Sequence, residues 1–497
     1  MVSKSHHILV IDIGTTATKA VIFDSTGTPV AIVRKNYPML TPQPDWVEQD
    51  PKIVLKGVLE ALKEAYKNKP MGVDIDAVSF SSQMYSIIAL SPNGHPLSNS
   101  LIWSDRRSAT TAEVFRQLPQ AKEIYQSTGC PIDAIYPFSK IAWLKNTSEG
   151  KKASKFISIK EYVLHRLIGD YVADWSIASA TGLFDIHQKR WHLQALHLAG
   201  IAENELSPLV SPRTIFTHWN PDVIQDIGIP QGTPCVIGGG DGALASVGVG
   251  AIGEGIAAVN VGTSAAARYM TSKPIIDPYG RLWTYLVDEG WWVIGGIVSS
   301  GGIVYDWFTQ NMGPREVSPE THEHETIDDK AAQIPPGAED LIFIPYLSGE
   351  QCPVWDPHTT GSFLGLTLRH TRAHLVRAVY EGIARSIARV LQSIEHTIEP
   401  IKEVRVTGGL INSSTWLQLA SDMFGTRIYV PETQEGSALG AAVMAWVALG
   451  FVPDILITRK MGKAKTFIEP NNNHHAYYQQ QSKRVEKILE ALKSTRS

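Results

Sequence analysis

The 497-residue chain has little cysteine, no excess of positive charge and no long apolar run, and each shortage excludes a class of protein. Its three cysteines lie far apart in the sequence, which argues against a disulfide framework and a zinc site. Lys and Arg number 45 against 49 for Asp and Glu, so no basic surplus is available for a nucleic-acid backbone. The most apolar region, 235–267, is glycine-rich and contains Asp241 and Glu254, unlike a membrane helix. The apolar run at 8–13 is too short for the core of a signal peptide. We therefore expect a cytoplasmic protein with neither nucleic acid nor membrane as partner.

An internal repeat predicts two similar domains. The apolar run at 8–13 ends in a Gly-Thr-Thr turn, and a second strand-like run follows. The segment Asp12–Thr16 is similar in sequence to Asn260–Ser264, which lies almost half the chain later. A repeat this long indicates duplicated domains rather than a solenoid. The chain length, at about 100–200 residues per domain, suggests two or three domains. We predict domains at 1–250 and 251–497.

Alternating patterns predict the α/β class. Strand-like runs alternate with helix-like stretches at 50–67 and 110–128. In the second half, apolar residues of 374–397 fall on one helical face. A further helix is expected at 437–449, where many Ala and Gly residues allow close packing on a sheet.

The two Gly-Thr turns are candidate phosphate-binding loops. Glycine permits a positive φ and exposes consecutive N–H groups, and the Thr or Ser hydroxyls that follow add donors. Lys19 lies close to the first turn in sequence. One such turn alone is more often a plain hairpin, but two copies at equivalent places favour phosphate binding. Together they would hold a nucleoside triphosphate between two domains. The GxxxxGK[ST] pattern of the Walker A loop is absent.

Two more glycine-rich segments follow strand-like runs. Asp241 lies in a GGGDG turn, where a carboxylate suits a general base or a metal contact. The alternative is an aspartate that stabilises its own turn. Gly408 and Gly409, followed by Asn412, form a strand-to-helix turn that would flank a purine, although such a turn is also common without any ligand.

In this order, the elements resemble the FGGY carbohydrate kinases, which share a superfamily with actin, hexokinase and the Hsp70 ATPase. The most specific match is 361–382, GSFLGLTLRHTRAHLVRAVYEG, which fits the second signature of the family. The first signature is matched less completely by YPFSKIAWL, with Lys140 and Trp143. The resemblance covers nearly the whole chain. It implies an α/β fold with two ribonuclease H-like domains and an interdomain cleft.

Within the family, four segments are most similar to the gluconate kinases: 78–88, 103–108, 157–163 and 176–182. The resemblance implies transfer of the γ-phosphate of ATP, with Mg²⁺, to the terminal hydroxyl of D-gluconate. A xylulose-type ketopentose kinase is the alternative. A non-catalytic ATP switch of the actin or Hsp70 kind would need neither the sugar segments nor the second signature. Tyr85 departs from the family, which commonly has His there, and this affects the detail of the sugar pocket. The protein could also form a homodimer, which the resemblance allows.

The resemblance also implies residue roles. Asp241 would accept the proton of the attacking hydroxyl, and Asp12 and Asp241 would orient water around the metal. Arg107 would bind the sugar-acid carboxylate or, alternatively, donate to a hydroxyl. The residues matched to ATP binding are Thr15, Thr16, Lys19, Gly262, Thr263, Ser264, Gly302, Asp306, Gly408, Gly409 and Asn412. The residues matched to sugar binding are Gln83, Met84, Tyr85, Asp105, Arg107 and Asp241.

Overall fold

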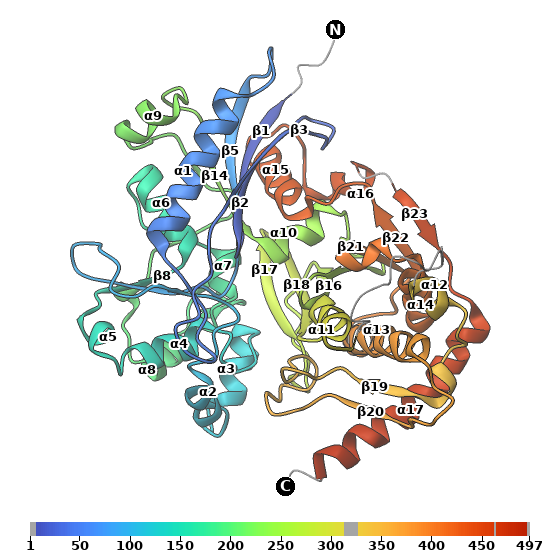
Figure 1. Cartoon of the computed structure of the whole chain (residues 1–497). Coiled ribbons are helices and arrows are strands. Elements are labelled where there is room, and N and C mark those ends of the chain that lie inside the picture. Colours follow the sequence, from blue (N-terminus) through green and yellow to red (C-terminus); the bar gives the residue numbers. More distant parts are fainter. Residues whose placement is uncertain (1–5, 313–326, 462–463, 495–497) are drawn as a thin grey trace. The chain divides into compact units, whose positions relative to one another are not determined.

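The computed structural model describes residues 6–312, 327–461 and 464–494. The chain forms two compact units, each built from separate stretches of sequence (Figure 1). The first unit comprises Met1–Ile252, Met270–Ile294 and Glu435–Gly462, and the second comprises Gly253–Tyr269, Gly295–Gln434 and Lys463–Ser497. A division at 250/251 would separate two of these stretches from the first unit, and those domain limits stay a prediction.

The first unit is built on a six-stranded sheet with the order β13-β14-β5-β1-β2-β3. Strand β1 pairs antiparallel with β2 and parallel with β5, and β5 pairs parallel with β14. The central strands are rich in Val, Ile and Ala and buried on both faces, as expected for strands covered by helices. Their bounds are β1 (His7–Ile13), β2 (Ala17–Phe23), β3 (Pro29–Asn36), β5 (Ile75–Ser82), β13 (Ile215–Phe216) and β14 (Cys235–Gly240).

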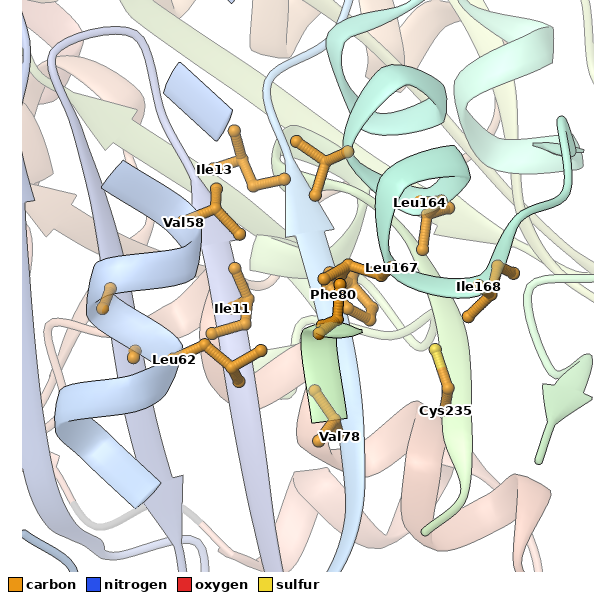
Figure 2. Packing of buried hydrophobic residues seen from close by; sticks show 14 of the residues in the cluster. Ile11, Ile13, Val58, Leu62, Val78, Phe80, Leu164, Leu167, Ile168 and Cys235 are labelled. Carbon is orange, nitrogen blue, oxygen red and sulfur yellow. The ribbon is translucent and has the colours of Figure 1, made fainter. Parts of the chain in front are cut away.

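Helices α1 (Pro51–Lys67) and α6 (Ile159–Ile168) contribute to the core on this sheet. Asp50 begins α1 because its side chain accepts a hydrogen bond from the backbone of Lys52, and Pro51 suits the first turn. Residues spaced three or four apart on α1 point toward β1, as Figure 2 shows for Val58 and Leu62. Helix α15 (Gly436–Ala448), red in Figure 1, packs on the same sheet and against α10 (Asp241–Gly248).

The second unit repeats this strand pattern. Strand β15 (Ile256–Val261) pairs antiparallel with β16 (Ala265–Thr271) and parallel with β21 (Glu403–Gly408), which pairs parallel with β22 (Arg427–Pro431). Strand β23 (Ala464–Ile468) adds an antiparallel edge. The order of pairings reproduces that of β1, β2, β5 and β14, so the repeat predicted from the two Gly-Thr turns is confirmed in the structure.

The predicted helices are present, with one difference. The expected helices at 374–397 and 437–449 are α13 (Arg372–Thr397) and α15. The stretch 110–128 contains two helices, α2 (Ala109–Arg116) and α3 (Ala121–Thr128), because Pro119 interrupts the backbone hydrogen bonding between them. None of the described helices combines the length and apolar character that a membrane crossing requires.

The remaining helices and strands complete the two units. Those in the first unit, or at its boundary, are β4 (Glu48–Gln49), β6 (Ile88–Leu90), β7 (Ser100–Leu101), α4 (Pro137–Leu144), α5 (Ser148–Lys152), β8 (Lys155–Ile157), β9 (Ala173–Asp174), α7 (Trp175–Ser179), β10 (Phe184–Asp185), β11 (Arg190–Trp191), α8 (Leu193–Ala199), β12 (Leu209–Val210), α9 (Pro221–Ile227), β17 (Trp283–Asp288), β18 (Trp291–Val298) and α16 (Thr458–Met461). Those in the second unit are α11 (Gly302–Met312), α12 (Ile327–Ala332), β19 (Ile342–Ile344), β20 (Ser362–Leu364), α14 (Ser414–Phe424) and α17 (Asn472–Ser494).

Candidate active site

Three chain segments leave the first sheet at the same edge. Strands β1, β5 and β14 are adjacent and parallel, and their last residues are paired: Ile13 with Ser82, and Ser82 with Gly240. The next residues are therefore the first Gly-Thr turn, Gln83 and Asp241. The carboxyl ends of parallel strands are where ligands bind in open α/β sheets. Strand pairing thus brings together residues that the sequence separates by more than half of the unit.

The first turn, Gly14–Thr16, presents its amides rather than its carbonyls. Its first carbonyl accepts from the hydroxyl of Tyr37 (2.6 Å) and from Nε2 of Gln83 (3.3 Å). Its second carbonyl accepts from Nε2 of Gln49 (2.7 Å), and its third from the amide of Tyr37 (3.0 Å). Within the described residues, the amides of Thr15 and Thr16 donate to no protein group. The turn therefore has two donors to offer to an anion such as a phosphate.

Asp12 and Lys19 lie opposite each other on β1 and β2. The ammonium group of Lys19 is 2.6 Å and 2.8 Å from the two carboxylate oxygens of Glu435, so its charge is already paired. Asp12 Oδ2 accepts from the hydroxyl of Ser437 (3.2 Å), whereas the buried Oδ1 has no hydrogen-bond partner among the described residues. Burial raises the pKa of Asp12, which hydrogen bonds and the charge of Lys19 oppose. An unpartnered carboxylate oxygen suits water or a hard cation.

Asp241 is the first residue of α10, not a residue of the glycine-rich turn that the sequence suggests. The three glycines before it are the end of β14, where Gly238 has a φ of 67° and the register with β5 shifts, and where Gly240 is extended up to the helix. Asp241 Oδ1 accepts from the amide of Gly242 (2.6 Å). The start of a helix favours the charged form of a carboxylate. Asp241 is half-buried, which leaves it accessible to a ligand as a proton acceptor. Among the described residues, no group of three or more His, Cys, Asp or Glu side chains could hold a metal ion.

The predicted sugar segment is buried and connected to the first turn. Nε2 of Gln83 donates to Oε1 of Gln49 (2.7 Å), while the buried Oε1 of Gln83 has no partner among the described residues. Met84 lies against Gly240, where a Cβ would be 2.8 Å from its Cγ. Tyr85 has a φ of 67°, and its hydroxyl donates to that of Tyr285 (3.2 Å). Gln83 is therefore the member of this segment with an acceptor left for a substrate hydroxyl.

Lys140 holds the backbone of this segment in place. Its Nζ donates to the carbonyl oxygens of Tyr85 (3.0 Å) and Ile102 (2.6 Å), and the residue is fully buried. Burial lowers the pKa of Lys140 to about 7. Ile102 in turn accepts from the amide of Asp105 (3.1 Å), so Lys140 joins two parts of the predicted sugar site. The first signature contains this lysine, but the sequence does not reveal which groups it contacts.

Asp105 and Arg107 form a closed ion pair. Arg107 donates from Nε (2.9 Å) and Nη2 (2.7 Å) to Asp105, which is fully buried, and from Nη2 to Glu48 (2.5 Å). The ring of Trp46 lies 3.8 Å from the guanidinium carbon. The two carboxylates of Asp105 and Glu48 therefore more than balance the single positive charge of Arg107. Of the guanidinium nitrogens, Nη1 is the one left to donate to a ligand. This arrangement favours hydrogen bonding to a sugar hydroxyl over binding of a substrate carboxylate.

The second turn, Gly262–Ser264, is held by the start of α11. Its first two carbonyls accept from the amides of Gly302 (2.7 Å) and Ile303 (3.1 Å). Within the described residues, the amides of Thr263 and Ser264 donate to no protein group. The second turn thus repeats the polarity of the first, with carbonyls bound and amides available. The sequence repeat predicted this similarity, whereas the supporting groups differ.

Other predicted nucleotide residues lie around the end of β21. Gly408 has a φ of 102°, and a Cβ there would be 2.3 Å from the carbonyl oxygen of Val261, so another residue would not fit. A Cβ at Gly409 would meet no atom within 4 Å, which leaves room beside the backbone. Asp306 on α11 and Asn412 are exposed. They are available for a ligand but carry no geometric sign of one.

The site also contains residues that sequence reasoning missed. Tyr285 reaches the sugar segment from a distant stretch of chain, as does Glu435 at Lys19. Gln49 and Glu48 lie together in WVEQD, a segment with no motif. A buried polar pair of this kind is not visible as a pattern in one sequence.

Two family models match almost the whole chain. They are described as the N-terminal domain of the FGGY family of carbohydrate kinases, matching residues 7–248, and its C-terminal domain, matching residues 257–449. The chain belongs to the FGGY family of carbohydrate kinases. It is therefore a phosphotransferase with the two-domain fold of that family. Sugar kinases of the family use ATP, generally with Mg²⁺.

Relatives with two different substrates are similar to this member. A gluconokinase of Bacillus subtilis (strain 168) is 38% identical over 451 residues, which cover 89% of this chain and 88% of the relative. A xylulose kinase of the same organism is 28% identical, covering 90% and 89%. The crystal structure of a gluconate kinase from Lactobacillus acidophilus is 32% identical, with a TM-score of 0.92 and 98% of each chain covered. A ligand-bound xylulose kinase from that organism has the same values.

Proposed function

We propose that this carbohydrate kinase transfers the γ-phosphate of ATP to the terminal hydroxyl of an open-chain sugar acid, D-gluconate, giving 6-phospho-D-gluconate. The observation that carries the proposal is the placement of Asp241, Gln83 and the first turn at one sheet edge. A proton acceptor, a hydroxyl-binding side chain and a phosphate-binding turn are the parts that phosphoryl transfer to an alcohol requires. The similarity to a gluconokinase at 38% identity supports the choice of sugar acid.

In the reaction, the protein mainly positions groups and balances charge. In the first unit, the amides of Thr15 and Thr16 would donate to phosphate oxygens. The second turn, within its own unit, offers donors of the same kind. Asp12 and Asp241 would hold the waters of a Mg²⁺ ion, which supplies neutralisation of phosphate charge when bound. The unpartnered Oδ1 of Asp12 fits that role.

Asp241 would act as the general base. As the substrate oxygen attacks the γ-phosphorus, its proton passes to the carboxylate, and the bond to the β-phosphate oxygen breaks to release ADP. Gln83 Oε1 would accept from a substrate hydroxyl, and Arg107 Nη1 would donate to another. Lys140 keeps the backbone of Tyr85 in place while these contacts form.

A xylulose-type ketopentose kinase is the second candidate. The observation in its favour is the ion pair of Arg107 with Asp105 and Glu48, which leaves no net positive charge there for a carboxylate. The equal similarity to a xylulose kinase structure agrees with it. Both candidates share the chemistry and differ in the sugar.

We further propose that the substrates are two small molecules, ATP and the sugar acid, and that the reaction takes place in the cytoplasm. The three cysteines are free and buried, which suits a reducing compartment. Neither nucleic acid nor membrane is proposed as a partner, and a homodimer is consistent with the resemblance.

The test is a coupled ADP-release assay with Mg·ATP and a panel of D-gluconate, D-xylulose, L-ribulose, glycerol and no sugar. The proposal expects saturable turnover with D-gluconate and at least about tenfold lower kcat/KM with the other sugars. A preference for D-xylulose would replace the substrate and keep the mechanism. ADP release that is independent of every sugar would refute the kinase assignment of the site and support the ATP switch.

A further inference from the structure

A buried glutamate lies behind the second turn and belongs to none of the motifs. Glu350 is 3% exposed and precedes Gln351 in the segment between β19 and β20. Its Oε1 accepts from the amides of Ser299 (2.6 Å) and Gln351 (2.9 Å). Its Oε2 is 2.9 Å from the hydroxyl of Ser300. Among the described residues, no cation lies within ion-pair distance of this carboxyl group.

Each of the hydrogen bonds around Ser300 has its own hydrogen when Glu350 carries a proton. The Ser300 hydroxyl is 2.9 Å from the carbonyl oxygen of Pro345 as well as 2.9 Å from Oε2 of Glu350. A hydroxyl has one hydrogen and can donate to one of these acceptors. If Glu350 is a neutral acid, its O–H donates to Ser300, and Ser300 donates to Pro345. If Glu350 is a carboxylate, one of the two short contacts has no hydrogen.

The segment that Glu350 holds continues directly into α11 and packs against the second turn. Ser299 and Ser300 precede Gly301, which packs so closely that a Cβ would be 2.4 Å from the backbone of Ser264. The next amide, that of Gly302, donates to the carbonyl of Gly262. The contacts of Glu350 therefore fix the start of α11, and the start of α11 fixes the turn.

We propose that Glu350 is a positioning residue for the second phosphate-binding turn and that it works in its neutral, protonated form. The proposal rests on the proposed function in one respect, since it takes ATP to be the ligand of that turn. Its consequence is that deprotonation of Glu350 disturbs the start of α11 and weakens the binding of ATP phosphates.

The charged groups around Glu350 agree with this form. Burial raises the pKa of Glu350 to about 7, against hydrogen bonds and the charge of Arg389 that lower it. Arg389 is on α13 and donates to the hydroxyl of Tyr346 (2.7 Å), and Arg385 on the same helix donates to Gln481. Asp356 contacts Glu350 through backbone atoms, with both N···O distances 3.0 Å. The nearest cations are thus committed to other partners.

The experiment compares the wild-type protein with E350Q, E350A and a control, E161Q. Gln reproduces the neutral acid, since its Oε1 accepts the two amides and its Nε2 donates to Ser300. E350A removes both functions. Glu161 is a second buried carboxyl group, in the first unit, whose pKa burial also raises and whose side chain caps α6. E161Q therefore controls for the loss of a buried acid anywhere in the protein.

The first measurement is KM for ATP at saturating sugar between about pH 6.5 and pH 8.5. We expect KM to rise at least about threefold with pH in the wild type and in E161Q, to stay constant in E350Q, and to be raised at every pH in E350A. A wild-type KM that does not change with pH, or a rise that persists in E350Q, would overturn the proposal.

The second measurement does not depend on ATP or on kinase activity. Amide hydrogen exchange at Gly302 and Ile303 reports whether their bonds to the second turn are closed. After correction for the intrinsic rate, protection should fall with pH in the wild type, persist in E350Q and be lost in E350A. Absence of sugar-dependent turnover in the wild type and in every variant, together with this exchange pattern, would refute the proposed function and leave the role of Glu350 supported. Equal protection in E350A and the wild type would refute the role of Glu350.

Discussion

Replacement of Lys140 by Met tests how the predicted sugar site is held in place. The wild-type ammonium is fully buried and donates to the carbonyls of Tyr85 and Ile102. Met fills a similar volume without donors or charge. The change therefore removes the Lys140 donor from the buried carbonyl of Tyr85, at a cost of about 1–3 kcal/mol, while the carbonyl of Ile102 keeps the amide of Asp105 as a donor. It also removes the cost of burying an ammonium group.

The electrostatic part can be calculated from the pKa of Lys140, which burial lowers from 10.5 to about 7. At 1.36 kcal/mol for each pKa unit, this difference destabilises the folded protein by about 5 kcal/mol at low pH. The unfolded chain holds the proton more tightly, so the penalty is complete below about pH 7 and disappears as the pH rises toward about 10.5. Between pH 7 and pH 9, the wild type should gain about 2 kcal/mol of stability relative to K140M.

The assay is urea unfolding of the wild type, K140M and K145M at these two pH values. Lys145 follows at the end of the same helix and forms a partly exposed ion pair with Glu205 (3.0 Å), so K145M removes a lysine without uncovering buried carbonyls. We expect the pH-dependent difference in K140M and none in K145M. The sugar assay should show a KM for sugar raised about tenfold in K140M with KM for ATP unchanged. An equal pH dependence in the wild type and K140M would refute the reasoning.

Two further substitutions test the reacting group and the ion pair. Asp241→Asn keeps the size and the contact with Gly242 but removes the base, so kcat should fall by about 10²–10⁴ while KM for ATP changes by less than about threefold; initial rates over a range of ATP decide, and wild-type turnover would exclude Asp241 as the base. Arg107→Met leaves the carboxylates of Asp105 and Glu48 unpaired, so the free energy of unfolding should fall by about 3–5 kcal/mol; urea unfolding measures it, and a loss below about 1 kcal/mol would contradict the closed ion pair.

The repeat and the two turns could be predicted because their signal is local. Asp12–Thr16 and Asn260–Ser264 each combine a β-rich run with a turn in which glycine and hydroxyl residues follow one another. The strand pairing that follows each turn is set by the same apolar pattern. The long helix α13 was equally visible, since its apolar spacing extends over 26 residues.

The groups that support the turns could not be predicted, because they come from other parts of the chain. Gln49 reaches Thr15 from the segment before α1, and Glu435 reaches Lys19 from the start of α15. Nothing in the sequence around these residues signals such a contact. A single hydrogen bond requires only one suitable side chain, and a single side chain produces no recognisable sequence pattern. The same holds for Asp241, whose place at a helix start depends on how far β14 extends beyond its apolar residues.

The ion pair of Arg107 changes how sugar selection should be understood. A free guanidinium would attract any carboxylate in reach, but Asp105 and Glu48 already match its charge. Lys140 is buried, donates to two backbone carbonyls and loses its proton near neutral pH, so it adds little positive charge that a substrate could use. The groups left for a ligand in this part of the first unit are then neutral or polar, chiefly Oε1 of Gln83 and Nη1 of Arg107.

A site of this kind selects by the positions of hydroxyl groups, because a buried donor or acceptor without its partner costs more than an extra methylene in an apolar pocket. The difference between gluconate and xylulose should therefore depend on which hydroxyls reach these atoms, and a carboxylate would be tolerated at the substrate's far end rather than bound by its charge.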